Sequence, residues 1–516
     1  MAISLPVVTV IKTATPTVVE NEEQRVLLLA QKTSAGNAVS GVLIENMPTD
    51  GSENALFGSN STIAAMVRDF KITNKVSRLD VIPLDDNGGA VAATGTLAIT
   101  GGATADGTLT LIVGSEENHK LTIAVANGDT PTTVGDAIEA AVNADTNAPV
   151  TAVNVTGTET FTAVNGGTVG NSITLVLRNP VAGLAFVLTG MASGATDPVL
   201  TGVFDVVGST RYQAVVTPSE YGQTFLTDFL DPRFNVANDI QDGVGFQCIA
   251  DTIANAKVLG DTLNSPSLSV GVNELVTPPN NTLHKGGALI ELNAVISTAF
   301  VAIRALRFTP GANISQFVLA PSGSTDNFGS ISTATLPYFN TPMPRLFPPL
   351  PINATTQQEQ EDLNASGLWT LDSNRTRTAV LTGSVLTTRK TDAAGNPEVT
   401  FKFLNGVDTS SQVAEFFFNN LKSQYAQFRI TDGDIFSDSN ITNVDAIKSF
   451  VVGMYNTLAG QLLTVAGDEA QTFFQENLVV VLTDSAAGKV NISAQVPLVT
   501  QLRELVVSLS FSFDAS

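Results

Sequence analysis

Between Gly88 and about Val203 the chain is dominated by Gly, Ala, Thr and Val. Six short apolar runs in this stretch are joined by turns that carry Gly or Asn, and each run has the length of one β-strand. They are the runs GTLAIT, GTLTLIV, HKLTIAV, VTAVNV, TFTAV and SITLVL. One helical segment interrupts them, with Thr133 and Asp136 placed as a capping box and Ile138, Ala141 and Val142 as its apolar stripe.

The same stretch contains nine acidic and two basic residues, a net charge of −7. This excess of acidic side chains indicates a surface that is exposed to solvent. We therefore predict that residues 88–203 form an inserted, β-rich outer domain with an acidic surface.

The chain on either side of this insertion alternates between strands and helices. The run EQRVLLLAQ predicts a buried strand, and the next segment places Ile63, Met66, Val67 and Phe70 on one face of a helix. SRLDVIPLDD follows as a second strand, and the alternation resumes near Tyr212 and continues to a strong helix over 286–306. This order predicts an α/β region made of residues 23–87 and 204–345.

A Pro-rich and then polar stretch over 340–364 predicts a domain boundary. Beyond it we expect a C-terminal core domain over 346–502, with hairpin-like strands and a helix at 410–428. Val413, Phe417, Leu421 and Tyr425 form the apolar stripe of that helix, and Glu415, Asn419 and Lys422 lie on its polar side. Three consecutive phenylalanines, Phe416 to Phe418, cannot all face one core; burial against two neighbouring elements is favoured over contact with a partner.

Both ends of the chain are apolar and patterned with period two. Near the C-terminus one face of a predicted strand carries five apolar residues and the other face three serines. The five are Leu505, Val507, Leu509, Phe511 and Phe513. The N-terminus places Ile3, Leu5, Val7 and Ile11 in one phase, and Pro6 suits an edge strand. The pattern alone leaves open whether these arms, residues 1–22 and 503–516, close a sheet of their own domain or pair with another chain.

Composition narrows the classes of function. The formal charge of −22 would repel phosphate backbones, so nucleic-acid binding is disfavoured. The single cysteine, Cys248, excludes an internal disulfide, and the two histidines, His119 and His284, each lie beside a lysine and are expected to be solvated. The first residues lack the features of a signal peptide and no apolar run is long enough to span a bilayer, so we expect folding in a cytoplasm and no membrane insertion.

A search for catalytic motifs finds no phosphate-binding loop, no HExxH and no GxSxG. Asp432, Asp434, Asp438 and Asn440 have spacing that a calcium ion would accept, but an Asx-rich turn is favoured because the bidentate Glu of an EF-hand is missing. The glycines Gly166, Gly167 and Gly170 are read as a tight turn. We expect no enzyme activity, no cofactor and no metal; a glycan-acting enzyme with paired carboxylates is an alternative that nothing in the sequence favours.

The order of segments resembles Mu-like contractile phage tail sheath proteins. The resemblance lies in ALFGSNSTIAAMVRDF, SRLDVIPLDDNGGAVAATGTLAITGG and GDTPTTVGDAIEAAVNAD, and it covers roughly residues 50 to 200. It implies a mixed α/β multidomain fold in which a sheath core domain carries an inserted outer domain and extended terminal arms. Beyond residue 200 the resemblance is looser, and the Pro-rich segment departs from it.

The resemblance also implies a function. Subunits of this family form hexameric rings stacked helically around an inner tail tube, between a baseplate and a tail terminator, in a virion tail assembled in the host bacterial cytoplasm. Their arms complete β-sheets of neighbouring subunits, and by analogy Glu415, Asn419, Lys422 and Arg429 are the candidates for facing the tube. A self-assembling surface-layer or adhesin-type protein is the alternative, against which the missing signal peptide counts.

Overall fold

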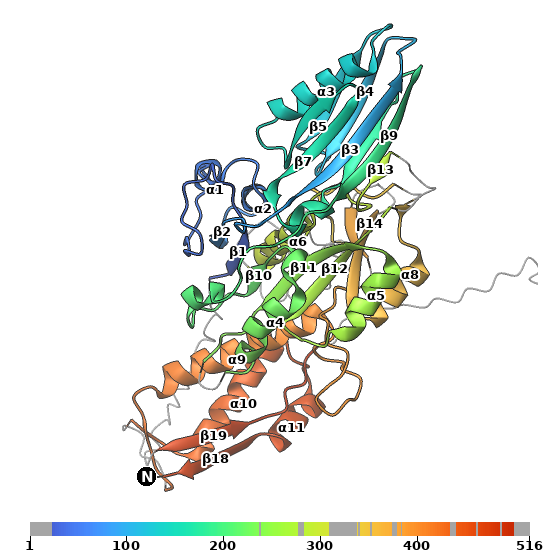
Figure 1. Cartoon of the computed structure of the whole chain (residues 1–516). Helices are drawn as coiled ribbons and strands as arrows, with labels where there is room; N and C mark the ends of the chain where they lie inside the picture. Colours follow the sequence, from blue (N-terminus) through green and yellow to red (C-terminus); the bar gives the residue numbers. More distant parts are fainter. Residues whose placement is uncertain are drawn as a thin grey trace, which may run out of the picture. The chain divides into compact units, whose positions relative to one another are not determined.

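The computed structural model describes residues 23–236, 239–276, 283–308, 338, 341–350, 353–373, 379–382, 384–433, 440–460, 463–485 and 488–499. Contacts divide these residues into a larger unit, Glu23–Ser411, and a smaller unit, Gln412–Val499 (Figure 1). The division falls within one long helix, and each unit is described by itself. The mixed α/β, multidomain class predicted from the sequence is confirmed, and the predicted domain limits stay predictions.

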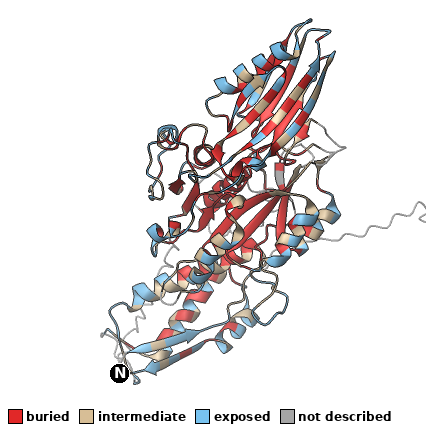
Figure 2. Cartoon of the chain, in the orientation of Figure 1, coloured by how far each residue is buried: buried red, intermediate tan, exposed pale blue. Residues whose placement is uncertain are grey.

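The larger unit is built on a seven-stranded sheet in the order β15-β14-β12-β11-β10-β1-β2, parallel except for β15. Its strands are β1 (Arg25–Gln31), β2 (Arg78–Leu84), β10 (Ala214–Val216), β11 (Val244–Asp251), β12 (Leu268–Glu274), β14 (Leu368–Ser373) and β15 (Ala379–Thr382). The central strands are buried along nearly their whole length, as the apolar runs predicted (Figure 2). The strands of a parallel sheet are apolar along their whole length because helices cover both faces of the sheet.

The helices of this unit are α1 (Glu53–Phe57), α2 (Thr62–Thr73), α4 (Gln223–Leu230), α5 (Ile253–Thr262), α6 (Asn293–Phe308) and α8 (Gln357–Ala365). One core packs α2 and α6 against Val26 and Leu28 of β1. The other packs α4, α5 and α8 against Leu27 and Leu29 of the same strand. Successive side chains of β1 therefore pack into the cores on opposite faces of the sheet, and this alternation fixes the register of the sheet.

The insertion is a sandwich of two four-stranded sheets, β6-β7-β3-β9 and β13-β8-β4-β5, around a core of its own. Its elements are β3 (Ala92–Gly101), β4 (Gly107–Val113), β5 (Lys120–Val125), α3 (Pro131–Ala144), β6 (Val150–Val155), β7 (Thr158–Gly166), β8 (Leu175–Arg178) and β9 (Leu184–Ala192). All six predicted strands are present. A seventh, β9, was missed, and an eighth, β13 (His284–Lys285), comes from a segment about 80 residues beyond the insertion.

Hydrogen bonds join the insertion to the seven-stranded sheet. The Asp86 carboxylate accepts from Nε2 of Gln31 at 2.6 Å, from the backbone NH of Gly166 at 2.8 Å and from Nδ2 of Asn165 at 3.1 Å. Nδ2 of Asn165 also donates to the Lys32 carbonyl at 3.1 Å. The end of β7 is thereby tied to the end of β1, so the insertion grows directly out of the sheet.

The smaller unit contains the end of α9 (Leu404–Tyr425) and the elements β16 (Arg429–Ile430), β17 (Ile441–Thr442), α10 (Val444–Gly460), α11 (Asp468–Glu476), β18 (Val479–Asp484) and β19 (Lys489–Ser493). Its buried residues include Val451, Tyr455, Leu458 and Phe474. The Tyr455 and Phe474 rings stack with their centroids 4.3 Å apart. The hairpin predicted between Asn477 and Val499 is confirmed as β18 paired with β19.

The predictions that both histidines are solvated are wrong. His119 and His284 are buried, with 7% and 2% of their surface exposed. Nδ1 of His119 lies 2.7 Å from Oδ2 of Asp145, and Nε2 of His284 lies 2.7 Å from the Gly287 carbonyl. The neighbouring lysines, of which Lys120 is exposed and Lys285 half-buried, do not indicate where a histidine lies, because adjacent residues of an extended chain point to opposite sides.

The capping box at Thr133 and Asp136 is also wrong. The helix α3 begins at Pro131, and Thr130 is its N-cap, whose side chain accepts from the backbone NH of Thr133. Pro131 occupies the first helical position, where its missing NH and fixed φ are favourable.

Candidate assembly surfaces

Seven of the residues predicted to join subunits lie outside the described residues. They are Leu5, Val7, Leu505, Val507, Leu509, Phe511 and Phe513. Their role as inter-subunit strands stays a prediction.

The hairpin of β18 and β19 is a two-stranded antiparallel sheet. Within the described part of the chain, no strand pairs with the outer edge of either. Much of this hairpin is exposed (Figure 2). Val479 and Val481 of β18 are 52% and 47% exposed, and Ile492 of β19 is 38% exposed. A two-stranded sheet is marginal by itself, and its open edges offer backbone NH and CO groups to a further strand.

The four candidates for facing a tube do not form one exposed face. Asn419 and Lys422 are exposed and lie three residues apart on α9, but Glu415 is buried, with 7% of its surface exposed. Arg429 is exposed but lies beyond the helix, in β16, where its backbone NH donates to the Asn440 carbonyl at 2.8 Å. Placing Glu415 on the solvated side of the helix was therefore wrong, while Asn419 and Lys422 remain accessible to a partner.

The three consecutive phenylalanines of α9 are not exposed. Phe416 is 5% exposed, and Phe417 and Phe418 are half-buried. The Phe416 and Phe417 rings meet edge to face at 6.2 Å, and the Lys422 ammonium lies 5.3 Å from the centroid of Phe418. Burial, the interpretation favoured by the sequence, is confirmed for Phe416; for Phe417 and Phe418 it stays a prediction.

A cluster of ion pairs lies between the insertion and the α/β region, and no local sequence pattern predicted it. Arg345 reaches Glu117 of the insertion at 2.7 Å and Asp69 of α2 at 3.5 Å. Burial raises the pKa of Asp69 to about 7, and burial together with the charges of Asp69 and Glu116 raises the pKa of Glu291 to about 8. Asp69, Glu117, Glu291 and Arg345 are 48 to 276 positions apart, so only the fold brings them together. Their contacts fit a structural joint.

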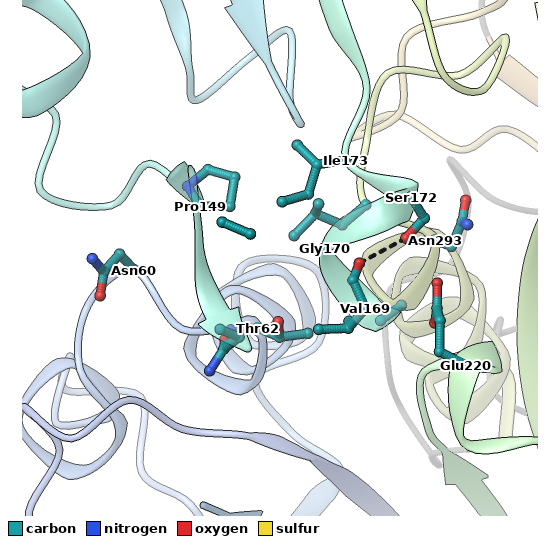
Figure 3. A pocket seen from close by; sticks show the side chains of 13 residues that line it. Asn60, Thr62, Pro149, Val169, Gly170, Ser172, Ile173, Glu220 and Asn293 are labelled. Carbon is teal, nitrogen blue, oxygen red and sulfur yellow. Dashed lines mark hydrogen bonds between the residues drawn. The ribbon is translucent and has the colours of Figure 1, made fainter. Parts of the chain in front are cut away.

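One pocket lies at the base of the insertion, where Thr62, Val169, Ser172, Glu220 and Asn293 are among its lining residues (Figure 3). Ser172 Oγ donates to the Val169 carbonyl at 3.0 Å. Burial raises the pKa of Glu220, and Nδ2 of Asn293 has no hydrogen-bond partner among the described residues. The space admits about one water molecule, too little for an organic substrate.

Within the described ranges, no group of three or more His, Cys, Asp or Glu residues could hold a metal ion. The same residues include no helix that is both long and apolar enough to cross a bilayer. A cysteine that acts as a nucleophile must be accessible to its substrate. Cys248 is 1% exposed, and burial raises the pKa of its thiol above the usual range.

Glu159, on the inner side of β7, yields a prediction on pH. Its side chain is fully buried, and neither carboxylate oxygen has a hydrogen-bond partner among the described residues. Burial, with smaller contributions from Glu139 and Asp136, raises its pKa from 4.5 to about 7. The folded state therefore favours the protonated form of Glu159. As the pH rises from about 4.5 to about 7, the raised pKa lowers the free energy of unfolding, by about 3 kcal/mol in all at pH 8.

We expect Glu159→Gln to raise the stability of the insertion at pH 8 by about 1–3 kcal/mol and to leave it nearly unchanged at pH 4.5. Urea denaturation followed by circular dichroism at both pH values measures this difference. Asp228→Asn, at an exposed carboxylate of α4, is the control and is expected to show no such change. Equal effects of Glu159→Gln at the two pH values would contradict the assignment.

Comparison with curated proteins gives one match of note. Over 200 residues the chain is 31% identical to the Mu-like prophage FluMu tail sheath protein of Haemophilus influenzae. The resemblance to Mu-like tail sheath proteins is confirmed. The match covers 38% of this chain and 40% of the length of the relative, which is less than half of either protein. No family model matches the chain.

Solved structures similar to the chain include the sheath tail protein of Desulfitobacterium hafniense, with 11% identity, 96% of this chain and 97% of that chain covered, and a TM-score of 0.45. The PVC sheath complex of an extracellular contractile injection system, in the contracted state, gives 10% identity, coverage of 100% and 99%, and a TM-score of 0.46. These scores are low, which leaves the sequence match as the comparison that bears on function.

Proposed function

We propose that this chain is the structural subunit of a contractile tail sheath. It polymerises as a helical tube around an inner tail tube and contracts to drive that tube through the host cell envelope. The observation that carries this proposal is the 31% identity, over 200 residues, to a Mu-like tail sheath protein. Such a subunit acts through contacts between its surfaces and those of its neighbours. We propose no enzyme activity for this chain.

The joints between subunits are the predicted terminal strands and the open edges of β18 and β19. A strand added to such an edge gains several main-chain hydrogen bonds, each worth about 0.5–1.5 kcal/mol net. Its alternating apolar residues fix the register, and exposed Val479 and Val481 give the receiving strand apolar contacts of its own. A joint of this kind bends without breaking, so subunits can rotate during contraction while they stay connected.

The proposed partners follow from the same assignment. They are further copies of the chain in stacked hexameric rings, the inner tail tube protein, and the baseplate and tail terminator at the two ends. Asn419 and Lys422, both exposed, are the residues of α9 proposed to meet the tube, and Arg429 joins them from β16. The assembled protein belongs to a virion tail, built in the host bacterial cytoplasm.

The energy of contraction is proposed to come from packing. Head-to-tail contacts that do not close on themselves generate a helix, and an extended helix with fewer contacts can be metastable with respect to a shorter, wider one. A trigger at one end then releases the transition subunit by subunit. No nucleotide is required in this scheme.

Electron microscopy of the purified, full-length protein tests the proposal. We expect tubes or stacked rings with a regular helical repeat, formed at high protein concentration. Flat two-dimensional lattices would instead favour the surface-layer alternative. Monomers that form no ordered polymer, alone or with an inner tube, would contradict both.

A further inference from the structure

The sheet β6-β7-β3-β9 of the insertion has an outer face that no element of the described chain covers. Its register aligns three rows of four residues across the strands. The rows are Val155–Thr158–Ala98–Val187, Val153–Thr160–Thr96–Thr189 and Thr151–Thr162–Thr94–Ala192. We call these twelve residues the outer face of the insertion.

Every position of the outer face is Thr, Val or Ala, so the face carries no formal charge. None of the twelve is buried, and Val153, Val155 and Val187 are 55%, 62% and 66% exposed. The alternate residues of the same strands, among them Leu97 and Phe161, form the core of the sandwich. The nine acidic residues of the insertion all lie elsewhere, on turns, on α3 or inside the sandwich.

The charge of the chain limits what can approach this face. With a net charge of −22, two copies of the chain repel each other overall. An uncharged face lined by valines and threonine hydroxyls adds nothing to that repulsion, and it offers apolar area together with hydrogen-bonding groups. A second copy that approaches this face therefore meets none of the acidic side chains that oppose its approach elsewhere on the insertion.

We propose that the outer face of the insertion is covered by a second copy of this chain when the chain assembles. This inference deepens the proposed sheath function and rests on it. In a polar helical tube the contact is heterologous, so the outer face of one subunit meets a different surface of its neighbour.

The size of the face explains why the contact would require the assembly. Four strands about 4.8 Å apart and six residues of about 3.3 Å each give an area of about 400 Å² per copy. The total of about 800 Å² is less than the roughly 1,200–2,000 Å² that stable pairs bury. The contact is then weak between two free monomers, where it needs a high protein concentration, and becomes strong when other joints hold the copies side by side.

Site-specific photo-crosslinking tests the proposal. Cys248 is 1% exposed, so Val153→Cys introduces the accessible thiol to which a benzophenone maleimide is attached. Ala140→Cys, at an exposed position of α3 in the same insertion, is the matched control. In assembled protein we expect covalent dimers from position 153 to exceed those from position 140 by about tenfold, and equal yields would overturn the proposal.

A pair of charge variants separates this proposal from the sheath function itself. Val153→Glu/Thr189→Glu places two acidic groups on the outer face, and Thr132→Glu/Ala140→Glu makes the same change on α3. We expect the first pair alone to raise the protein concentration needed for assembly by about tenfold, because two carboxylates would lose their water when the contact buries them. Unchanged assembly of the first pair would overturn the copy–copy contact and leave the sheath function standing.

The test remains decisive if the wild-type chain forms no polymer and the sheath function fails. Photo-crosslinking is then carried out on concentrated monomer, where weak association through the face still favours position 153 over position 140. Without that preference the outer face is not a contact between copies.

Discussion

Removal of residues 503–516 is expected to abolish polymerisation and to leave a folded, soluble monomer. The predicted C-terminal strand carries five apolar residues in one phase, and the hairpin β18–β19 has open edges that such a strand can extend. Loss of the strand removes one joint from every subunit of the polymer, so the effect is multiplied along the tube. Size-exclusion chromatography and electron microscopy of the truncated protein measure the loss, and circular dichroism checks the fold.

Two pairs of substitutions serve as matched variants of the deletion. Phe511→Ser/Phe513→Ser keeps the length of the strand but removes its apolar anchors, and we expect it to reproduce the deletion. Ser510→Thr/Ser512→Thr changes the opposite phase and is expected to polymerise normally, since Thr favours extended backbone. Aggregation or unfolding of the truncated chain would show that the strand belongs to its own core.

The receiving edge makes a separate prediction. Val479→Lys/Val481→Lys places two charges on β18, a change that discourages edge-to-edge pairing of strands. We expect assembly to be reduced strongly while the hairpin itself persists, because both positions are about half exposed in the monomer. Polymerisation at the wild-type concentration would show that β18 does not receive a strand.

The sequence predicted the strands because their pattern is local. β1 reads as a continuous apolar run since both of its faces are covered, and β3 alternates since one of its faces is open. The strand β9 was missed although Phe186, Leu188 and Met191 point inward, because a register shift between Thr94 and Thr96 breaks the alternation that reveals a strand. β13, with two residues, has no local pattern at all.

The candidate site was less accessible to sequence reasoning. The helical period placed Glu415 opposite the apolar stripe of α9, but packing around the helix buries it. The partners of Arg345 and the uncharged rows of the insertion depend on which distant strands and loops meet, and neither leaves a trace in a local window. The alternation of apolar and polar residues along each strand predicts which positions are exposed. Only the structure shows the register that aligns these positions across the sheet.

Asp408→Ala is expected to destabilise the larger unit by about 3–5 kcal/mol, because it leaves a buried cation without its counter-charge. The Asp408 side chain is fully buried and accepts from Nη2 of Arg304 at 2.5 Å and from the Tyr338 hydroxyl at 2.7 Å. Burial and the charge of Asp408 raise the pKa of Tyr338, which keeps its hydroxyl a donor. The carboxylate therefore binds the start of α9 to α6, at the centre of the unit.

Fluorescence of Trp369, the single tryptophan, measures this loss directly. Its ring is fully buried and lies 5.3 Å from that of Phe300, which in turn lies 5.3 Å from that of Tyr338. We expect the urea midpoint to fall far more in Asp408→Ala than in Asp362→Ala, which breaks the surface pair with Lys257. The double variant Arg304→Met/Asp408→Leu removes both charges and should recover much of the loss, since the cost comes from an unpaired charge and not from a missing attraction. Equal midpoints for Asp408→Ala and Asp362→Ala would show that the buried pair does not hold α9 to α6.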